Sequence, residues 1–385
     1  MDTTTPLVDF APVLRMALLA LVVAMLPLSW LWLRSRGADT RARLAALTAL
    51  TMFLTFDLIV FGSFTRLTDS GLGCPDWPGC YGEASPLGAR QDIHAAEQVM
   101  PGGPVTWGKA WIEMIHRYLA MSVGVLIIVM TIVSWHQRRR LPHSPWWPTL
   151  TLVWVVVQGL FGKYTVTLKL YPAIVTLHLL GGMALLALLA AQHEAFRDRP
   201  LALGAGLRRA TLAVTALVLL QIALGGWVST NYAVLACSGF PACNGQWWPP
   251  MALAEGFTVV RELGHTGDGA LLPLEALVGI HLVHRLGAVL VLAALAWLAW
   301  RLAAEPALRR YGLALALLGV WQLASGLSNV VLGWPIVAAL AHAAGAAGLV
   351  GVLTSLLARA PAHRGLHADR SRPMAPIGAS LDQGG

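Results

Sequence analysis

Residues 111–135 read WIEMIHRYLAMSVGVLIIVMTIVSW, an apolar run that carries a histidine, His116, close to its start. A run of roughly 20 apolar residues is long enough to cross a lipid bilayer as a helix. Residues 276–300, ALVGIHLVHRLGAVLVLAALAWLAW, form a second such run with His284 at a similar position. Ionisable side chains inside membrane helices are costly and mark functional sites. The two runs therefore predict a membrane protein with a duplicated histidine site.

The composition favours the same class of protein. Of the 385 residues, 57% are hydrophobic and only 12% are charged, and the mean hydropathy is +0.65. Such values are typical of integral membrane proteins and argue against a soluble globular domain. The sequence predicts an all-α polytopic fold with about nine transmembrane helices. The apolar runs cover residues 11–33, 44–63, 111–135, 146–165, 172–193, 208–228, 276–300, 309–331 and 335–358.

Clusters of arginine predict the orientation of these helices. They follow every second run, and the basic connections of a membrane protein lie on the cytoplasmic side. We therefore expect a multi-pass protein of the cell (inner) membrane with its N-terminus outside and its C-terminus in the cytoplasm. Topology then accounts for the net charge of +8, which indicates no nucleic-acid partner. The arginines are Arg34, Arg36, Arg41, Arg43, Arg138, Arg139, Arg140, Arg197, Arg199, Arg208, Arg209, Arg301, Arg309, Arg310, Arg359, Arg364, Arg370 and Arg372.

The two ends of the chain fall outside the repeated part. The first run is expected to be a retained helix within residues 1–38, because its head lacks the positive charges of a signal peptide and the run is long for one. Residues 359–385 are polar and contain Pro and Gly, which predicts a disordered cytoplasmic tail.

All four cysteines fall in the two long connections on the predicted outer side, residues 64–110 and 229–275. Each pair brackets five residues that include an aromatic residue followed by Pro, Trp77-Pro78 in the first and Phe240-Pro241 in the second. An oxidising exterior favours one disulfide in each loop, Cys74–Cys80 and Cys237–Cys243. Four free thiols are the alternative, and a structural zinc site is less favoured because the usual short ligand spacing is missing.

The cysteines also reveal an internal repeat. A constant offset of about 163 residues relates landmarks across the chain, which indicates two tandem four-helix halves, residues 44–200 and 208–358. Because the offset spans an even number of membrane crossings, the halves are expected to share one orientation and to be related by an axis along the membrane normal. The matched landmarks are Gly62 with Gly225, Cys74 with Cys237, Cys80 with Cys243, His116-Arg117 with His284-Arg285, Gln158 with Gln322, Gly162 with Gly326, and His178 with His342.

Each half contains two histidines at matching depth. His116 and His178 in the first half, and His284 and His342 in the second, lie about five to eight residues inside their runs, on the order of 8–12 Å deep at roughly 1.5 Å per residue. Facing side chains in the core of a four-helix bundle commonly hold a cofactor. Two neutral imidazoles can ligate a haem iron from both sides. Haem is therefore the predicted ligand.

Glycines that follow the histidines are candidates for lining the slot of a porphyrin. The alternative is that they only let helices pack closely in lipid. They are Gly181, Gly182, Gly287, Gly345 and Gly348.

Three arginines are candidates for binding haem propionates. Arg117 and Arg285 directly follow the first histidine of each pair, where a guanidinium could bind a carboxylate. The alternative is an arginine that reaches the membrane surface without a ligand. Arg66 lies just outside the second run and is a candidate for the first site only, because its counterpart is Ser229.

The two halves differ three residues before the duplicated His-Arg, where the first has Glu113 and the second has His281. Residues three apart share a helix face, so Glu113 is expected one turn from His116, where it could act as acid, base or nucleophile. The alternative is a glutamate solvated by the outer loop. We expect chemistry in the first half and a permanent cofactor in the second.

Taken together, the chain resembles haem A synthase, a membrane enzyme of cytochrome oxidase assembly. The resemblance covers about residues 44–358. The order and spacing of its elements are more specific than any one of them. They are Gly62-Ser63-Phe64-Thr65-Arg66-Leu67-Thr68, Ser70-Gly71-Leu72, the Cys-Pro-Asp-Trp-Pro segment from Cys74, Glu113-Met114-Ile115-His116-Arg117, Gln158 with Gly162, Leu224-Gly225-Gly226-Trp227-Val228, His281 with His284-Arg285, and His342.

The resemblance implies that a methyl group of haem O is oxidised to the formyl group of haem A by successive hydroxylations, with water as the oxygen source. It implies that His116 and His178 hold the substrate haem and that Glu113 assists catalysis. It further implies that His284 and His342 ligate the iron of a resident haem B. The first cysteine pair would take part in redox handling.

The resemblance also implies partners. These are haem O as substrate, membrane lipid, a haem O synthase that supplies the substrate, and an electron acceptor. The family's usual count is eight helices, so the first helix is extra and could contact such a synthase. The oligomeric state is left open, a homo-oligomer included. Two other functions fit the histidine pattern: a dihaem b-type electron-transfer cytochrome, and a haem carrier or exporter.

Overall fold

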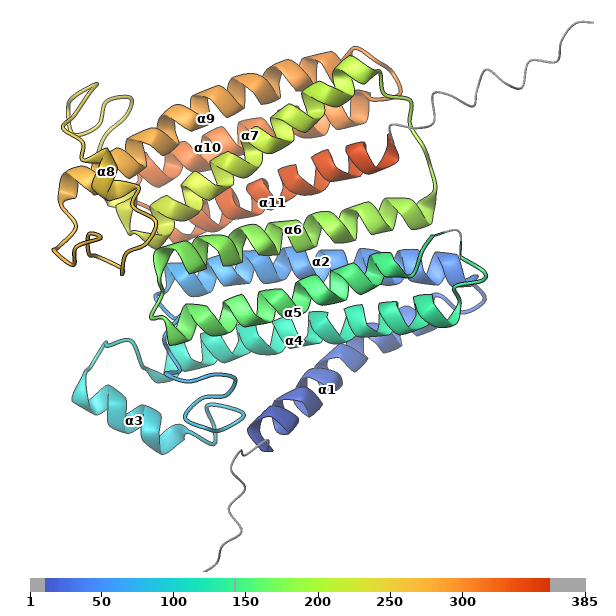
Figure 1. The fold of residues 1–385 in the computed structure, drawn as a ribbon, viewed down its shortest axis with the longest axis horizontal. Helices are drawn as coiled ribbons and strands as arrows, with labels where there is room; N and C mark the ends of the chain where they lie inside the picture. Colours follow the sequence, from blue (N-terminus) through green and yellow to red (C-terminus); the bar gives the residue numbers. More distant parts are fainter. Residues whose placement is uncertain (1–10, 142, 361–385) are drawn as a thin grey trace, which may run out of the picture.

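The computed structural model describes residues 11–141 and 143–360, and in this part of the chain it confirms the all-helical membrane fold (Figure 1). Nine described helices are long and apolar enough to cross a membrane. Their bounds lie within a few residues of the predicted runs. These helices are α1 (Ala11–Arg34), α2 (Thr40–Leu67), α4 (Trp107–His136), α5 (Trp146–Thr167), α6 (Pro172–Arg197), α7 (Ala205–Thr230), α9 (Leu274–Ala303), α10 (Arg309–Val331) and α11 (Ile336–Arg359).

Polar caps start two of these helices earlier than hydropathy predicts. The side chain of Asp39 accepts a hydrogen bond from the backbone N–H of Ala42 at 2.7 Å at the start of α2. Thr106 caps α4 in the same way through the N–H of Lys109 at 3.3 Å. Such bonds satisfy N–H groups that have no partner within the helix. As a result, His116 lies nine residues after the first residue of α4.

The spanning helices form two groups that meet along α6 and α11 (Figure 1). α2, α4, α5 and α6 make one group, and α7, α9, α10 and α11 make the other. α6 also packs against α7, and α11 also packs against α2. That these groups are two haem-binding halves related by an axis along the membrane normal stays a prediction. Most of the predicted tail, beyond residue 360, lies outside the described residues.

The extra helix α1 lies outside the first group and crosses α4 at an angle (Figure 1). Its Met16 is buried, and the carbonyl of Ala20 accepts a hydrogen bond from Ser122 of α4 at 3.4 Å. Arg15 pairs with Glu83 in the first long connection at 3.6 Å. α1 therefore contacts both the first group and its loop.

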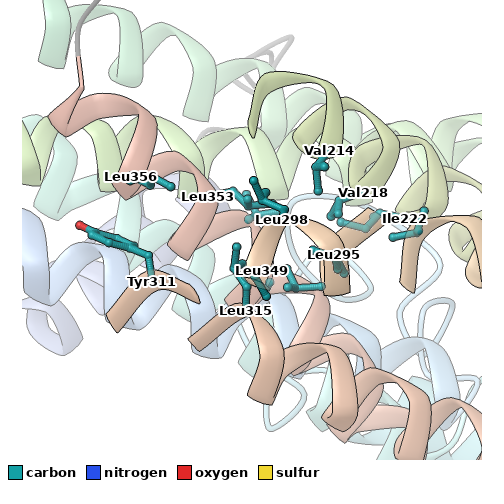
Figure 2. Packing of buried hydrophobic residues seen from close by; sticks show 14 of the residues in the cluster. Val214, Val218, Ile222, Leu295, Leu298, Tyr311, Leu315, Leu349, Leu353 and Leu356 are labelled. Atoms are coloured by element: carbon teal, nitrogen blue, oxygen red, sulfur yellow. The ribbon is translucent and has the colours of Figure 1, made fainter. Parts of the chain in front are cut away.

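The largest apolar cluster of the described residues lies mainly within the second group (Figure 2) and reaches the first. Leu298 on α9, Leu315 on α10 and Leu353 on α11 have no exposed surface. The cluster continues to Ile59 on α2 and Met183 on α6. Because close packing holds helices together in lipid, this cluster fixes α11 against the first group.

Both long connections lie at the same end of the bundle (Figure 1). They contain short helices that the apolar runs did not reveal: α3 (Arg90–Val99) in the first, and η1 (Ala233–Leu235) with α8 (Leu253–Gly256) in the second. Which side of the membrane this end faces stays a prediction.

Candidate functional site

Each histidine of the first half lies against a glycine of the preceding membrane helix. A Cβ added at Gly62 of α2 would lie 3.0 Å from Nε2 of His116, and one at Gly162 of α5 would lie 3.6 Å from Cε1 of His178. The ring of Phe61 stacks on His116 with 6.3 Å between ring centroids. The imidazoles therefore occupy space that a larger residue on the facing helix would fill.

The second half repeats this arrangement. A Cβ added at Gly225 of α7 would lie 3.0 Å from Cε1 of His284, and one at Gly326 of α10 would lie 3.1 Å from Cε1 of His342. The sequence had already matched Gly62 with Gly225 and Gly162 with Gly326 as repeat landmarks, but it did not reveal that they face the histidines. Their shared offset with the histidines was the signal that could have found them.

His116 and His178 lie within electrostatic range of each other, and so do His284 and His342. That each pair holds a haem stays a prediction. One member of each pair is on the second helix of its group and the other is on the fourth. Two imidazoles placed in this way match the donor set of a bis-histidine haem.

The glycines after the histidines face other side chains. A Cβ at Gly181 would collide with the amide of Gln158, and one at Gly345 with the ring of Trp321. Gly287 faces the amide oxygen of Gln221 in the same way. These glycines make room for side chains of the facing helix, as in the helix-packing alternative, and the predicted slot-lining role finds no support at these positions.

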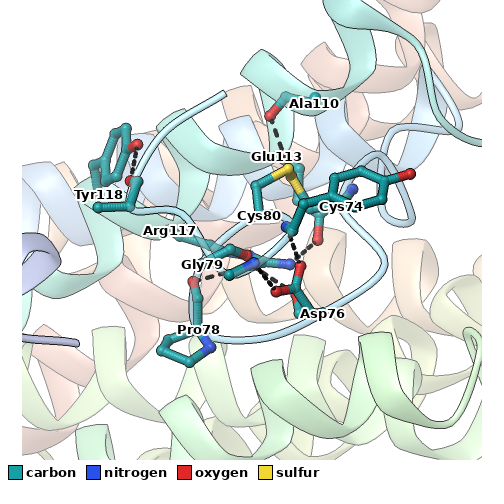
Figure 3. Close-up of a disulfide and its surroundings, with 12 residues drawn as sticks. Cys74, Asp76, Pro78, Gly79, Cys80, Ala110, Glu113, Arg117 and Tyr118 are labelled. Atoms are coloured by element: carbon teal, nitrogen blue, oxygen red, sulfur yellow. Dashed lines mark hydrogen bonds and ion pairs between the residues drawn. A yellow bond between two sulfur atoms is a disulfide. The ribbon is translucent and has the colours of Figure 1, made fainter. Parts of the chain in front are cut away.

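Glu113 is buried and contacts the first cysteine loop (Figure 3). Its Oε2 accepts a hydrogen bond from the backbone N–H of Cys74 at 2.8 Å, and its Oε1 pairs with Arg117, one turn along α4. The side chain is only 5% exposed. The loop and Arg117 therefore satisfy this carboxylate, as the alternative of a glutamate held by the outer loop requires, and its part in catalysis stays a prediction.

Arg117 ties the same loop to α4 (Figure 3). Besides Glu113, its guanidinium donates to the carbonyls of Asp76 and Pro78 at 3.0 Å each, and to that of Gly79. The disulfide Cys74–Cys80 closes the loop around these carbonyls. Arg117 is 8% exposed, so it does not reach the surface as a free arginine.

Arg285 plays the corresponding part in the second half. It donates to the carbonyls of Cys237 at 2.7 Å and Gly239 at 3.0 Å, within the loop closed by the disulfide Cys237–Cys243. Where Arg117 has a carboxylate partner, Arg285 donates to Nε2 of His281 at 3.2 Å. The duplicated arginines therefore anchor both loops, and binding of propionates stays a prediction.

Arg66 lies in the last turn of α2, not outside it, and joins the two groups of helices. It donates to the carbonyl of Ser229, its own counterpart, at 2.6 Å, pairs with Asp69 at 3.1 Å, and lies 3.9 Å from the ring centre of Tyr232. The hydroxyl of Tyr232 donates to Asp69 at 2.7 Å, and burial raises the pKa of this hydroxyl. A propionate at Arg66 stays a prediction.

We expect Arg117→Met to lower the free energy of unfolding by roughly 3–5 kcal/mol, the range for removing one partner of a buried ion pair. The reason is that Glu113 would remain as an unpaired buried carboxylate. Arg285→Met should cost less, because its neighbour His281 can remain neutral. Thermal unfolding of both purified variants in detergent measures the difference, and equal losses would contradict it.

A double variant tests the cause of this loss. Adding Glu113→Gln to Arg117→Met removes the unpaired charge and should recover part of the stability, which gives a coupling energy between the two positions.

Comparisons with known proteins agree on one family. The family model for cytochrome oxidase assembly protein, COX15-CtaA, matches residues 45–354. The chain is 37% identical to a protein named Heme A synthase from Shewanella oneidensis over 321 residues, which are 82% of this chain and 96% of the relative. It is 28% identical to the Heme A synthase of Allorhizobium ampelinum over 82% of this chain and 90% of the relative. Its identity to the Heme A synthase of Shouchella clausii is also 28%, over 65% of this chain and 71% of the relative.

Proposed function

This chain belongs to the cytochrome oxidase assembly protein family, and from that premise we propose that it is a haem A synthase that oxidises haem O to haem A. The observation that carries the proposal is the difference between two otherwise matched sites. Glu113 is buried one turn from His116 in the first half, while His281 takes that position in the second. A carboxylate at only one of two histidine pairs suits one site for chemistry and one for a permanent cofactor.

In the proposed reaction, His116 and His178 hold haem O by its iron. The methyl group and one water give the formyl group, four protons and four electrons, by way of a hydroxymethyl intermediate. The electrons pass to a separate electron acceptor, so the enzyme is an oxidoreductase. Glu113 is the group that accepts a proton from the water as the new carbon–oxygen bond forms.

His284 and His342 are the proposed ligands of a resident haem B. Two features support the fit. Gly225 and Gly326 leave space at the two rings, and the Nδ1 atom of His342 has a hydroxyl partner. When bound, haem B supplies one-electron redox chemistry. The chain's own residues hold and orient the ligand rings.

The cysteine loops are assigned to the outer face of the cell membrane, and the C-terminus to the cytoplasm. A haem O synthase is the proposed source of the substrate. Arg117, Arg285 and Arg66 remain candidates for propionate contacts, for which each would exchange part of its present bonding.

The experiment that tests this function is to purify the protein from cells that supply haem O, extract the porphyrins in acid, and separate them by chromatography with mass detection. Haem A or its hydroxylated intermediate, together with haem B, supports the synthase. Haem B alone at two per chain, with haem O plentiful, would reject it in favour of a dihaem electron-transfer cytochrome. Unchanged haem O bound in exchange with the medium would indicate a carrier.

Two glycines of α10 offer a matched test of the haem B site. We expect Gly326→Ala to weaken haem B retention by roughly tenfold, the low end for disturbing the surroundings of a metal ligand, because the new Cβ would lie 3.1 Å from the His342 ring. Gly319→Ala is the control, since nothing lies within 4 Å of a Cβ there. Transfer of haem to apomyoglobin measures retention, and equal rates in both variants would contradict the assignment.

A further inference from the structure

The second histidine of one pair has a hydrogen-bond partner at Nδ1, and the second histidine of the other pair has none among the described residues. In the second half, Oγ of Ser325 lies 3.1 Å from Nδ1 of His342. In the first half, Nδ1 of His178 is buried and has no hydrogen-bond partner among the described residues. The two histidines are otherwise matched, because each faces a glycine of the preceding helix.

The residue responsible for the difference can be read from the repeat. Gln158 with Gln322, Gly162 with Gly326 and His178 with His342 all share an offset of 164 residues. The same offset relates Ser325 to Phe161. The position matched to Ser325 therefore carries no hydroxyl in the first half.

The hydrogen bonds of Ser325 fix the direction of its contact with His342. Its single hydroxyl proton is assigned to the carbonyl of Trp321 at 2.7 Å, the shortest of its three contacts, since the carbonyl of Gln322 lies at 3.4 Å and Nδ1 of His342 at 3.1 Å. The oxygen is then left to accept a hydrogen bond from Nδ1–H of His342, which favours the tautomer with its proton on Nδ1. In that tautomer Nε2 is unprotonated, which is the form that ligates a metal.

The other histidine of the second pair also has a polar neighbour. The amide of Gln221 lies 2.9 Å from Nδ1 of His284 and 2.9 Å from the carbonyl of His284. Its counterpart in the first half is Leu58. A backbone carbonyl can only accept, so the amide donates through its nitrogen and Nδ1 of His284 is an acceptor. Gln221 therefore does not accept a proton from its histidine, whereas the oxygen of Ser325 can.

We propose that Ser325 is a positioning residue that holds His342 in the tautomer and orientation needed to retain haem B, and that Phe161 leaves His178 unheld so that a substrate haem can be exchanged. This inference rests on the proposed function. Outer partners of metal-bound histidines orient the ring and raise its basicity. A site with such a partner suits a permanent cofactor, and a site without one suits a haem that must leave after each turnover.

The test uses the full-length protein in detergent after loading with haem B. Ser325→Ala removes only the hydroxyl, and Ser325→Thr keeps one. Ser328→Ala is the matched control, because Ser328 lies on the same helix and its hydroxyl bonds to the carbonyl of Ala324. We expect Ser325→Ala to release haem B to apomyoglobin roughly 10- to 100-fold faster and to raise the midpoint potential of the haem. Ser325→Thr should restore both values, and Ser328→Ala should change neither.

A merely structural role of Ser325 predicts a different result. If Ser325→Ala lowers thermal stability but leaves haem release and midpoint potential at the wild-type values, the inference is overturned. The inference can also fail separately from the proposed function. Wild-type protein that makes no haem A, combined with faster haem release in Ser325→Ala, rejects the synthase and keeps the positioning residue. Haem A formation by the wild-type protein, combined with unchanged haem release in Ser325→Ala, keeps the synthase and rejects the positioning role of Ser325.

Discussion

Glu113→Gln is expected to slow haem O oxidation by roughly 100- to 10,000-fold, the usual contribution of general acid–base catalysis, and to leave haem B in the protein. Glutamine has nearly the same size as glutamate, and its amide oxygen can still accept the hydrogen bond from the N–H of Cys74. Arg117 loses its carboxylate partner but keeps its bonds to the carbonyls of Asp76, Pro78 and Gly79, so the first loop should stay in place. The amide cannot take up a proton, so the chemical step is lost.

Two measurements separate the possible roles of Glu113. Conversion of haem O is followed by chromatography with mass detection, and haem B content is measured from the visible spectrum of the reduced haem. Glu97→Gln, on the surface helix α3, is the control for loss of a carboxylate. Conversion by Glu113→Gln at the wild-type rate would mean that the carboxylate serves only to hold Cys74 and Arg117.

The structure also makes glutamine a better choice than alanine at this position. Glu113→Ala would leave the N–H of Cys74 and the guanidinium of Arg117 without their acceptor. Because buried groups without partners are costly, such a variant could lose activity by releasing the loop. The pair of variants distinguishes catalysis from loop anchoring.

The membrane helices were predictable because each is encoded by a run of many apolar residues, so that no single residue decides the prediction. An apolar run of membrane length predicts a helix wherever it occurs, and α10 begins and ends as its run predicts. The errors fall where polar residues extend a helix, as at the Asp39 cap of α2. The short helix α3 was missed because it lies in a polar loop and carries no apolar run.

The histidine pairs were predictable from their repetition, but their surroundings were not. Ser325 is an ordinary residue in a membrane helix, and its contact with His342 depends on how two helices rotate against each other. Hydropathy carries no information on that rotation. The bonds of Arg117 to loop carbonyls were likewise hidden, because backbone acceptors leave no mark in the sequence. Comparing the halves position by position, as in Phe161 against Ser325, recovers part of what a single helix cannot show.

The two histidine pairs are expected to differ in how firmly they retain haem. We expect His342→Ala to remove haem B almost completely from the purified protein, because one of the two proposed histidine ligands would be lost. His178→Ala should retain haem B and lose turnover of haem O. Both histidines face a glycine of the neighbouring helix, so the two variants remove equivalent groups from matched positions. A difference in haem B content between the two variants therefore reports which pair holds haem B. It does not reflect a difference in how deep the two histidines lie in the membrane.

The measurement is the ratio of haem B to protein after purification, together with the low-spin visible spectrum. His193→Ala is the control, because His193 lies on α6 with His178 but bonds to the carbonyl of Ala45 at 3.0 Å, away from either pair. Loss of haem B from His178→Ala with retention in His342→Ala would exchange the two sites. Loss of one haem B from each variant, out of two in the wild type, would show two permanent haems and support the electron-transfer cytochrome. If the protein holds a single permanent haem at His284 and His342, haem B should be retained in His178→Ala and lost from His342→Ala.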